Sequence, residues 1–410
     1  MDVIPSGGDG KVKFGHGNPS LPRPGATGET DRMQTNPLVL FSAWIIALSF
    51  FPFSLKGGET LKSEVVLELS ISEGNPRNTE GDIVPLKDGR LFLVYTRFTG
   101  GGSDHDTADL VSRVSSDGGH TWSDRDEMVV ANAGGLNVMS VSLLRLQDGR
   151  IALFYLEKNS LTDCRPVVRF STDEAASWSA PVGIIPDSET GYYVLNNDRV
   201  IQHSGGRLLA PLALHHRPDW EKPDWNGEVG AYYSDDAGES WKRSGQWKKA
   251  HDSGGKRVAA QEPGLIERKD GSLLMYIRTG AGELYRSESR DLGMNWSDPE
   301  PMGVASPQSP ATIERIPGSD TLVMVWNDHS HLPVAERKAR TPLSLALSHD
   351  EGKSWSKTFV IEPDPKGWFC YTAMEFTPEA LLLAYVAGEQ SPGKHLSASR
   401  VRRISLTELR

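Results

Sequence analysis

The sequence predicts an all-β fold, a six-bladed β-propeller of four-stranded antiparallel blades. Two turn patterns that alternate along the chain carry this prediction. The first is Ser-x-Asp-x-Gly-x-x-Trp, which occurs five times and ends at Trp122, Trp178, Trp241, Trp296 and Trp355. The second is a short turn, most often Asp-Gly, that lies between successive copies of the first. A repeat of roughly 55 to 65 residues with two hairpins has the size of one four-stranded blade.

Each copy of the tryptophan pattern is expected to form a hairpin turn. The Ser and Asp side chains can bond backbone amides of the turn, the Gly adopts a positive φ, and the Trp packs back over the preceding residues. In the second copy, Ala175 stands in place of the glycine. We interpret this pattern as a folding element and not as a catalytic site.

The second turn series predicts six hairpins, because each turn lies between two apolar strand-like runs. The turns are Asp88-Gly89, Asp148-Gly149, Gly205-Gly206, Asp270-Gly271, Gly318 to Asp320, and Pro378-Glu379. Six repeats then fill residues 59–410 as one domain. A sixth tryptophan pattern is missing, so we expect residues 65–69 to close the ring by pairing with residues 381–385 and 398–404.

The composition excludes several classes of protein. The chain has 410 residues, 38% of them hydrophobic, and a formal net charge of −10, which is unlike a disordered chain or a collagen. No basic stripe is present, so we expect no nucleic-acid partner. Two cysteines, Cys164 and Cys370, cannot build a disulfide scaffold, and we favour two thiols over a single disulfide. No metal-ligand spacing, P-loop or Gly-x-Ser-x-Gly motif occurs, so neither a metal nor a cofactor is expected.

The N-terminus contains two segments that should not belong to the propeller. Residues 1–32 show no hydrophobic period, and we interpret them as a disordered or mis-assigned leader before a start at Met33. An uncharged run, LVLFSAWIIALSFFPF, covers residues 38–53, so residues 33–58 are predicted to be a signal peptide. The alternatives are an uncleaved N-terminal anchor, which would be the only membrane contact, and a buried helix. With a signal peptide or an anchor, the folded domain is expected outside the cytoplasm, secreted or periplasmic.

The blade topology predicts which residues meet. If the short turns join first to second strands and the tryptophan turns join third to fourth strands, both series lie on one face. The opposite face then collects Glu80, Arg97, Asp104, His105, Asp106, Ser140, Lys158, Arg165, Asn197, Asp198, His215, Glu262, Arg278, Ser309, Asn327, Arg340 and Tyr371. Cationic side chains are frequent in this set although the whole chain is acidic, which favours a small anionic ligand. For any one residue, an ion pair between blades is an equal alternative.

At the level of individual residues, the five tryptophan patterns resemble the Asp-box of sialidases. The segment from Gln261-Glu262 to Arg278 resembles the family's Glu followed by a strand pair that ends in Arg. Arg340 stands where the family has an Arg upstream of its last Asp-box, and Tyr371-Thr-Ala-Met resembles the segment of its nucleophilic Tyr. The loop 101–106 stands at the place of its acid/base Asp. The resemblance covers residues 59–410.

The resemblance implies an exported, retaining exo-glycosidase that removes a terminal acidic sugar, similar to sialic acid, from glycans. Tyr371 would be the nucleophile and Glu262 its base, while Asp106, or Asp104 as second choice, would serve as the acid/base. The substrate carboxylate would bind to Arg278, Arg340 and Arg77. The other expected substrate-binding residues are Arg97, His105, Asn137, Lys158, Arg165, Asn197, Asp198 and His215.

One element departs from the sialidase pattern. Sialidases open the first blade with Arg-Ile-Pro, whereas the corresponding segment here runs from Asn75 to Asp82, with Glu80 near the place of that arginine. The literal Arg315-Ile-Pro317 falls inside a predicted strand of the fifth blade. Two alternatives therefore stay open. One is a hydrolase of another glycoside or uronate that uses Glu80, Asp82 and His105; the other is a non-catalytic glycan-binding propeller.

Overall fold

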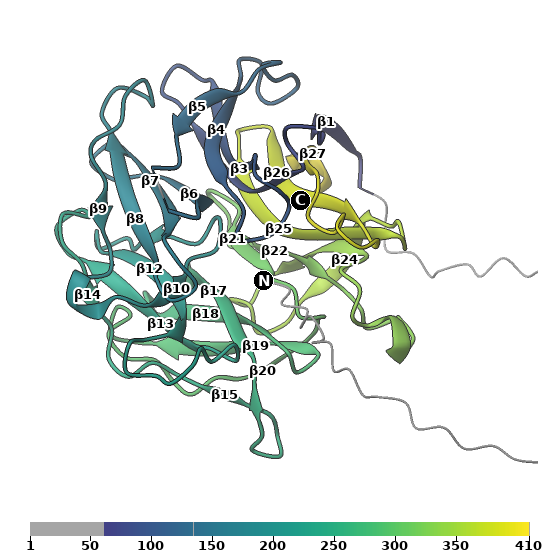
Figure 1. The fold of residues 1–410 in the computed structure, drawn as a ribbon. Helices are drawn as coiled ribbons and strands as arrows, with labels where there is room; N and C mark the ends of the chain where they lie inside the picture. Colours follow the sequence, from purple (N-terminus) through teal and green to yellow (C-terminus); the bar gives the residue numbers. More distant parts are fainter. Residues whose placement is uncertain (1–60, 134, 410) are drawn as a thin grey trace, which may run out of the picture. The chain divides into compact units, whose positions relative to one another are not determined.

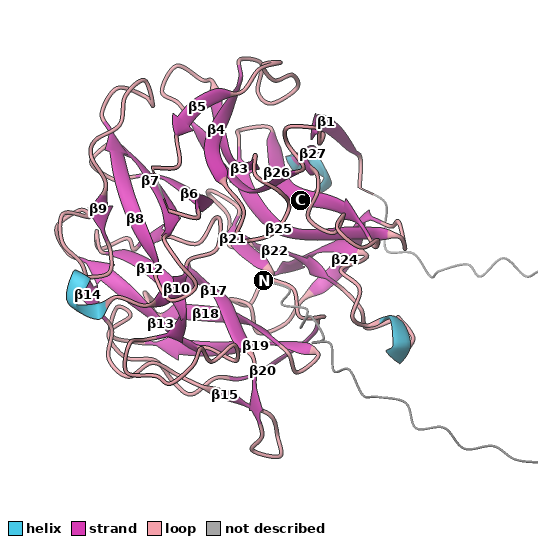
Figure 2. Ribbon diagram, viewed as in Figure 1, coloured by secondary structure: helices cyan, strands magenta, loops and turns pink. Residues whose placement is uncertain are grey.

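The structure, a computed structural model, describes residues 61–133 and 135–409. Within these residues the fold is all-β, as the turn patterns predict, and its only helices are three single 3₁₀ turns at Asp187–Glu189, Val334–Glu336 and Leu406–Glu408 (Figure 2). The predicted leader and signal peptide lie outside the described residues. Among the helices of the described part, none is long and apolar enough to cross a membrane.

Four sheets have the predicted four-stranded antiparallel form. The first contains β2 (Arg77–Pro85), β3 (Leu91–Phe98), β4 (Ala108–Ser115) and β5 (Glu127–Val130). Another contains β17 (Ala260–Glu267), β18 (Leu273–Thr279), β19 (Glu283–Ser289) and β20 (Glu300–Ala305). The next contains β21 (Thr312–Arg315), β22 (Leu322–Asn327), β23 (Leu343–Ser348) and β24 (Ser356–Glu362). In each, the strands pair in sequence order, so each sheet is a meander.

The last of these sheets closes the chain on itself. It contains β25 (Gly367–Phe376), β26 (Ala380–Glu389), β27 (Ser399–Ser405) and, as its outer strand, β1 (Ser63–Leu69). The N-terminal strand pairs antiparallel with β27, with Leu69 opposite Ser399. The predicted pairing of residues 65–69 with residues 398–404 is therefore confirmed, and it protects an edge that would otherwise be exposed. The predicted pairing with residues 381–385 is wrong, because these residues lie in β26, on the other side of β27.

The region between these sheets differs from the prediction. Residues expected to form two separate blades lie in one nine-stranded sheet. One half has β6 (Asn137–Arg145), β7 (Ile151–Lys158), β8 (Cys164–Ser171) and β9 (Val182–Gly183); the other has β11 (Ile201–Gln202), β12 (Leu208–His216), β13 (Glu228–Ser234) and β14 (Lys242–Arg243). β10 (Tyr192–Val194) joins the halves, pairing parallel with β8 and antiparallel with β12. A separate ribbon pairs β15 (Ala250–His251) with β16 (Arg257–Val258).

The first strands of the sheets lie next to one another (Figure 1). β2 contacts β6 on one side and β25 on the other, β17 contacts β12 and β21, and β21 contacts β25. The amide of Asp198, just before β11, donates to the carbonyl of Val141 in β6. The sheets therefore follow one another around a circle, and residues far apart in sequence meet where the first strands begin.

Both turn series lie where the patterns predict. The Asp-Gly type turns join first and second strands, for example β2 to β3, and the tryptophan turns join third and fourth strands, for example β4 to β5. In all five tryptophan turns the serine hydroxyl accepts from the amide two residues after the aspartate, as Ser115 does from Gly119. The aspartate accepts from the amide four residues later, as Asp117 does from Thr121. These hydrogen bonds within the turn explain why the pattern recurs.

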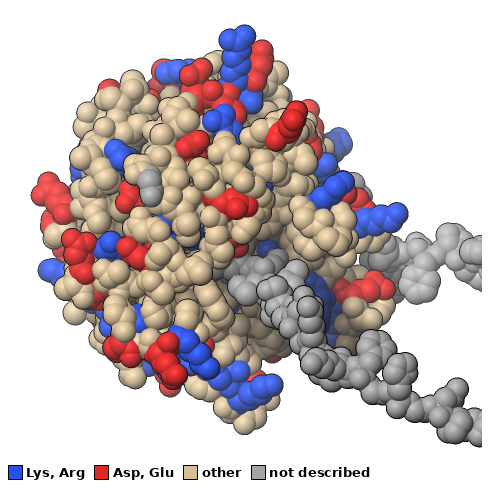
Figure 3. Space-filling view, viewed as in Figure 1, with Lys and Arg blue, Asp and Glu red and all other residues tan. Residues whose placement is uncertain are grey.

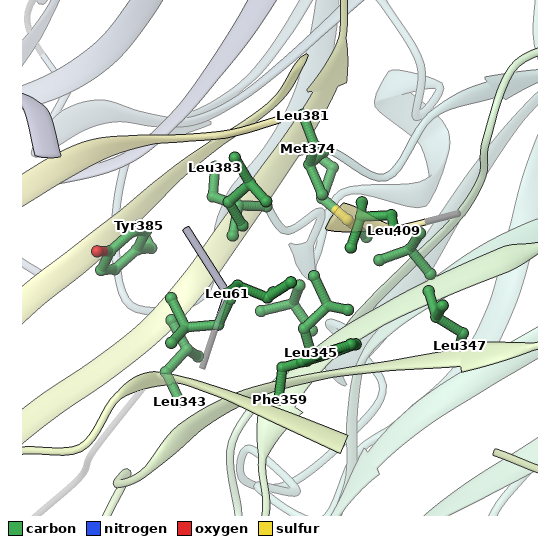
Figure 4. Packing of buried hydrophobic residues seen from close by; sticks show 14 of the residues in the cluster. Leu61, Leu343, Leu345, Leu347, Phe359, Met374, Leu381, Leu383, Tyr385 and Leu409 are labelled. Carbon is green, nitrogen blue, oxygen red and sulfur yellow. The ribbon is translucent and has the colours of Figure 1, made fainter. Parts of the chain in front are cut away.

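Hydrophobic side chains fill the space between neighbouring sheets. Figure 4 shows the cluster between β21–β24 and β25–β27, where Leu345 and Phe359 face Met374 and Leu383. Leu61 also packs in this cluster. Acidic and basic side chains lie interspersed over the face seen in Figure 3. The apolar strand residues thus hold the sheets together. The polar residues at the start of the first strands are not part of this packing and can form a functional site.

Candidate active site

A repeated backbone distortion brings polar side chains to the start of the first strands. Glu80, Ser140, Asp198, Glu262 and Tyr371 all have a positive φ, between 44° and 61°. Residues with bulky side chains rarely adopt this conformation, which concentrates at functional sites. Four of the five coincide with register shifts in β2, β6, β17 and β25. These are bulges that re-aim a side chain, and they fall at the positions that the turn spacing selected.

Tyr371 and Glu262 meet at this end of the sheets. The Tyr371 hydroxyl donates to Glu262 Oε1 at 3.4 Å, and Arg278 Nη1 lies 2.6 Å from Glu262 Oε2. All three side chains are buried. Burial, followed by the Glu262 carboxylate, raises the pKa of Tyr371 well above its usual value. Burial also raises the pKa of Glu262, but the neighbouring positive charges, first Arg278 and then Arg340, together outweigh it and hold this pKa below its usual range. The pair therefore consists of a neutral phenol beside an ionised carboxylate.

Arg340 lies against the same tyrosine. Its guanidinium carbon is 5.4 Å from the centre of the Tyr371 ring and 5.2 Å from that of Trp368. Its Nη2 donates to the carbonyl of Gln308 at 3.2 Å. Cation–π contacts with these two rings stabilise the guanidinium beside Tyr371. The structure thus brings Glu262, Arg278, Arg340 and Tyr371 together, from β17, β18, the segment before β23, and β25.

The first sheet contributes a second group of charges. Arg77 Nη1 lies 2.6 Å from Asp104 Oδ1, and Arg77 Nη2 lies 3.4 Å from Glu80 Oε1. The Ser140 hydroxyl donates to the other oxygen of Glu80. Burial raises the pKa of Glu80 despite Arg77. Burial also raises that of Asp104, but Arg77 outweighs it and lowers this pKa far below its usual range. Arg77 therefore already has two carboxylate partners.

The structure orients the two candidate acid/base residues differently. Asp104 faces Arg77, whereas Asp106 Oδ2 accepts from the amide of Ser103 in its own loop. Asn137 Nδ2 donates to the main-chain carbonyls of both Asp104 and Asp106, at 2.9 Å each. Lys158 Nζ donates to the main-chain carbonyl of Asp104 at 2.7 Å. Asn137 and Lys158 thus support the loop. The second choice, Asp104, is the aspartate that joins the charged group.

Several expected substrate-binding residues have other partners. Arg97 pairs with Asp126, and Arg165 pairs with Asp163 and Asp187. His105 is exposed on the loop. Both arginines are held by ion pairs, but these pairs lie within one repeat and do not link adjacent blades as the alternative interpretation supposed. The literal Arg315 pairs with Glu351 at the opposite ends of the strands, as its position in a strand requires.

His215, Asn197 and Asp198 lie close to the site but bond to main-chain groups. His215 Nδ1 lies 3.0 Å from the carbonyl of Asp224, and its ring packs against Tyr192 and Trp225. Burial lowers the pKa of His215 to about 4. Asn197 Nδ2 donates to the carbonyls of Gly81 and Tyr371, and Asp198 Oδ2 accepts from the amide of Met374. Each supports neighbouring strands with its hydrogen-bonding groups.

Two residues at the site were missed by the sequence analysis. Trp368 stacks on Arg340, and Gln308 supplies the carbonyl that Arg340 binds. An aromatic residue three positions before Tyr371 was a signal that could have pointed to Trp368. Gln308 acts through its backbone, so its side-chain identity carried no signal. The described residues include no group of three His, Cys, Asp or Glu side chains suited to a metal ion.

Antiparallel meander sheets follow one another around a circle, and a Tyr–Glu–Arg group lies where their first strands begin. Together these features are typical of the sialidase class of β-proteins. The model of the BNR repeat-like domain matches residues 98–383, and this chain belongs to that family, within the sialidase superfamily.

Curated relatives and a solved structure agree with this assignment. The chain is 32% identical over 167 residues to the anhydrosialidase of Macrobdella decora, covering 38% of this chain and 19% of that protein. It is 24% identical to the sialidase of Micromonospora viridifaciens, covering 78% of this chain and 51% of that protein. The chain thus spans about half or less of these relatives. The sialidase of Trypanosoma rangeli has a similar fold, with a TM-score of 0.65 at 15% identity over 86% of this chain and 61% of that one.

Proposed function

We propose that this protein is a retaining exo-glycosidase of the sialidase type that hydrolyses a terminal acidic sugar from glycans. Its circle of sheets would be a six-bladed propeller, with the nine-stranded sheet counted as two blades. The uncharged run at residues 38–53 supports export. The proposal extends what the names of the relatives say of those proteins, sialidase and anhydrosialidase, to this chain.

The observation that carries the proposal is the buried Tyr371–Glu262–Arg278 chain of contacts. A phenol with a raised pKa is a poor nucleophile unless a base removes its proton. Glu262 is ionised because Arg278 lowers its pKa, and its carboxylate lies 3.4 Å from the phenol. A purely glycan-binding protein has no need to place an ionised base on a buried phenol.

The reaction would proceed in two steps. The Tyr371 oxygen attacks the anomeric carbon, Glu262 takes the phenol proton, and Asp104 protonates the departing glycosidic oxygen. Asp104 would carry this proton only after the substrate carboxylate has replaced it on Arg77, because in the free protein Arg77 holds the pKa of Asp104 far below its usual range. Water then attacks the sugar–tyrosine bond, with Asp104 accepting its proton and the tyrosine leaving, so the anomeric configuration is retained. Because a carboxylate on the anomeric carbon would repel a carboxylate nucleophile, a neutral phenol suits an acidic sugar. Arg278 and Arg340 would bind that carboxylate.

Glu80 favours a second candidate function. This carboxylate occupies the bulge of the first strand, near the place where sialidases carry an arginine, and it pairs with Arg77. A carboxylate there accepts hydrogen bonds from sugar hydroxyls and repels a substrate carboxylate that approaches it. The same fold would then hydrolyse a glycoside or uronate whose hydroxyl groups face Glu80.

The experiment that separates these candidates measures hydrolysis of fluorogenic sialosides and uronides by the purified protein. We expect sialoside hydrolysis that is lost in Tyr371→Phe and in Arg340→Ala, with a retained product configuration by NMR. Activity confined to uronides or neutral glycosides, and sensitive to Glu80→Gln, would support the second candidate. Glycan binding without any hydrolysis would overturn the enzyme assignment.

A further inference from the structure

The backbone at Tyr371 is held in an unusual conformation. Its φ of 56° lies in the left-handed region that aromatic residues rarely adopt. Such a conformation persists only where neighbouring groups hold it in place. The bulge in β25 lies between Cys370 and Ala373, so the strand leaves its ladder with β26 at the tyrosine. Hydrogen bonds from other sheets must therefore replace the missing ladder contacts.

Asn197 supplies two of these hydrogen bonds from the segment before β11. Its Nδ2 donates to the carbonyl of Tyr371 at 3.0 Å and to the carbonyl of Gly81 at 3.0 Å. The side chain is fully buried. Because both partners are carbonyls, only the NH₂ side of the amide can face them. One amide therefore bridges the first and last sheets at their bulges.

The other backbone groups around the bulge are held in the same way. Asp198 Oδ2 accepts from the amide of Met374 at 3.0 Å, and the Thr312 hydroxyl donates to the carbonyl of Thr372 at 2.5 Å. Of these contacts, that of Asn197 is the one made to the tyrosine itself. A hydrogen bond to this carbonyl fixes the peptide plane that follows Tyr371, and with it the direction of the ring toward Glu262.

We propose that Asn197 is a positioning residue: its amide holds the Tyr371 bulge so that the phenol stays within reach of Glu262, and it links this bulge to that of Glu80 through Gly81. The proposal rests on the proposed function in that Tyr371 is the nucleophile. It adds a positioning role to the expected substrate contact of Asn197, because both donor hydrogens of its amide are used by backbone carbonyls.

Asn327 provides a matched control. Its Nδ2 also donates to two carbonyls, those of Phe369 at 3.1 Å and Pro342 at 3.3 Å, and it is equally buried. Asn197→Ala and Asn327→Ala each remove one bridging amide that contacts β25. We expect similar decreases in the unfolding midpoint. In contrast, kcat should fall roughly 30- to 100-fold for Asn197→Ala, with little change in KM, and less than about 3-fold for Asn327→Ala. Equal losses of kcat in both variants, or an effect of Asn197→Ala on KM alone, would overturn the proposal.

A second measurement does not depend on activity. The ¹³Cζ resonance of Tyr371, assigned by its absence in Tyr371→Phe, reports the surroundings of the phenol. We expect it to move in Asn197→Ala and to stay in place in Asn327→Ala. If the wild-type protein hydrolyses no glycoside, the proposed function fails, but this shift still tests the positioning role. Should Asn197→Ala not fold, Asn197→Ser retains one donor in a smaller side chain, and an unmoved resonance in that variant overturns the proposal.

Discussion

The hydroxyl of Tyr371 lies 3.4 Å from Oε1 of Glu262, although 109 positions separate the two residues in the chain. Both stand on positive-φ bulges of first strands, in β25 and β17. The same carboxylate contacts Arg278 through its other oxygen. The two environments therefore give the residues different roles: Glu262 is kept ionised and can act as a base, whereas Tyr371 remains a neutral phenol.

Glu262→Gln should therefore impair the chemical step more than substrate binding. Removing the base leaves the phenol protonated, and we expect kcat to fall by about 10²- to 10⁴-fold. KM should change little. Steady-state kinetics on an activated glycoside test this. Glu267→Gln, on the same strand but bonded to Ser204 at its far end, is the control and should retain activity. Equal activity of Glu262→Gln and wild type would exclude Glu262 as the base.

Asp104 and Asp106 should differ as general acids. Only Asp104 faces the charged group, because the Asp106 carboxylate accepts from its own loop. We expect Asp104→Asn to lower kcat/KM by about 10²- to 10⁴-fold on an oligosaccharide, whose leaving group needs a proton. The loss should be much smaller on an aryl glycoside with an acidic leaving group. Asp106→Asn should behave like wild type on both substrates, and the reverse pattern would make Asp106 the acid.

A cluster of carboxyl groups beside the site should make stability depend on pH. Asp198 and Glu314 share a hydrogen bond, and Glu375 and Asp82 lie near them. Burial, and then the neighbouring charge of Asp198, raises the pKa of Glu375 to about 8. Burial also raises that of Asp198 to about 6. Because these values exceed the unfolded value of ~4, protonation stabilises the fold. That contribution is complete below about pH 4 and lost as the pH rises through about 6 to 8.

Glu375→Gln tests this dependence, since an amide keeps the protonated shape and cannot ionise. In urea unfolding, the variant should match wild type below about pH 4 and exceed it by about 1 kcal/mol or more at pH 8.5. Glu73→Gln, at an exposed position outside the cluster, should follow wild type at both pH values. A constant difference between Glu375→Gln and wild type across pH would show that Glu375 does not titrate in this range.

A substitution in the second tryptophan turn should increase the stability of the protein. Ala175 has a φ of 67°, where the other four copies carry glycine, at Gly119, Gly238, Gly293 and Gly352. Relief of backbone strain should let Ala175→Gly stabilise the protein by about 0.5 to 1 kcal/mol. Ala176→Gly, next in the chain and without a positive φ, should destabilise by about 0.5 kcal/mol because glycine has a more flexible unfolded state. Chemical denaturation of the two variants gives both values.

Local patterns were sufficient for the β-class, the hairpins and the closing strand. The side chains of Ser115 and Asp117 bond to groups of their own turn, such as the amide of Gly119, so the spacing of these residues in sequence is enough to predict the turn. The positions of Glu80, Glu262 and Tyr371 also followed from the sequence, because each lies a set distance before a turn. The sequence did not predict that the residues of two expected blades form one nine-stranded sheet, because this sheet depends on Tyr192 pairing with a strand from another repeat.

The contacts that each side chain of the site makes were decided by the tertiary structure alone. The sequence by itself determined that Arg97, Arg165, Arg278 and Arg340 lie near strand ends, but each guanidinium binds whichever carboxylate or ring the neighbouring element presents. Arg97 pairs with Asp126 and Arg278 with Glu262, each within one sheet, whereas Arg340 lies against Tyr371 of the neighbouring sheet. The contact of Asp104 with Arg77 and the hydrogen bond from Asn197 to the carbonyl of Tyr371 have the same origin. The hydrogen bonds of a turn join residues that are close in sequence, so the turn can be predicted from the spacing of its residues. Ion pairs and the hydrogen bonds of buried amides join segments that only folding brings together.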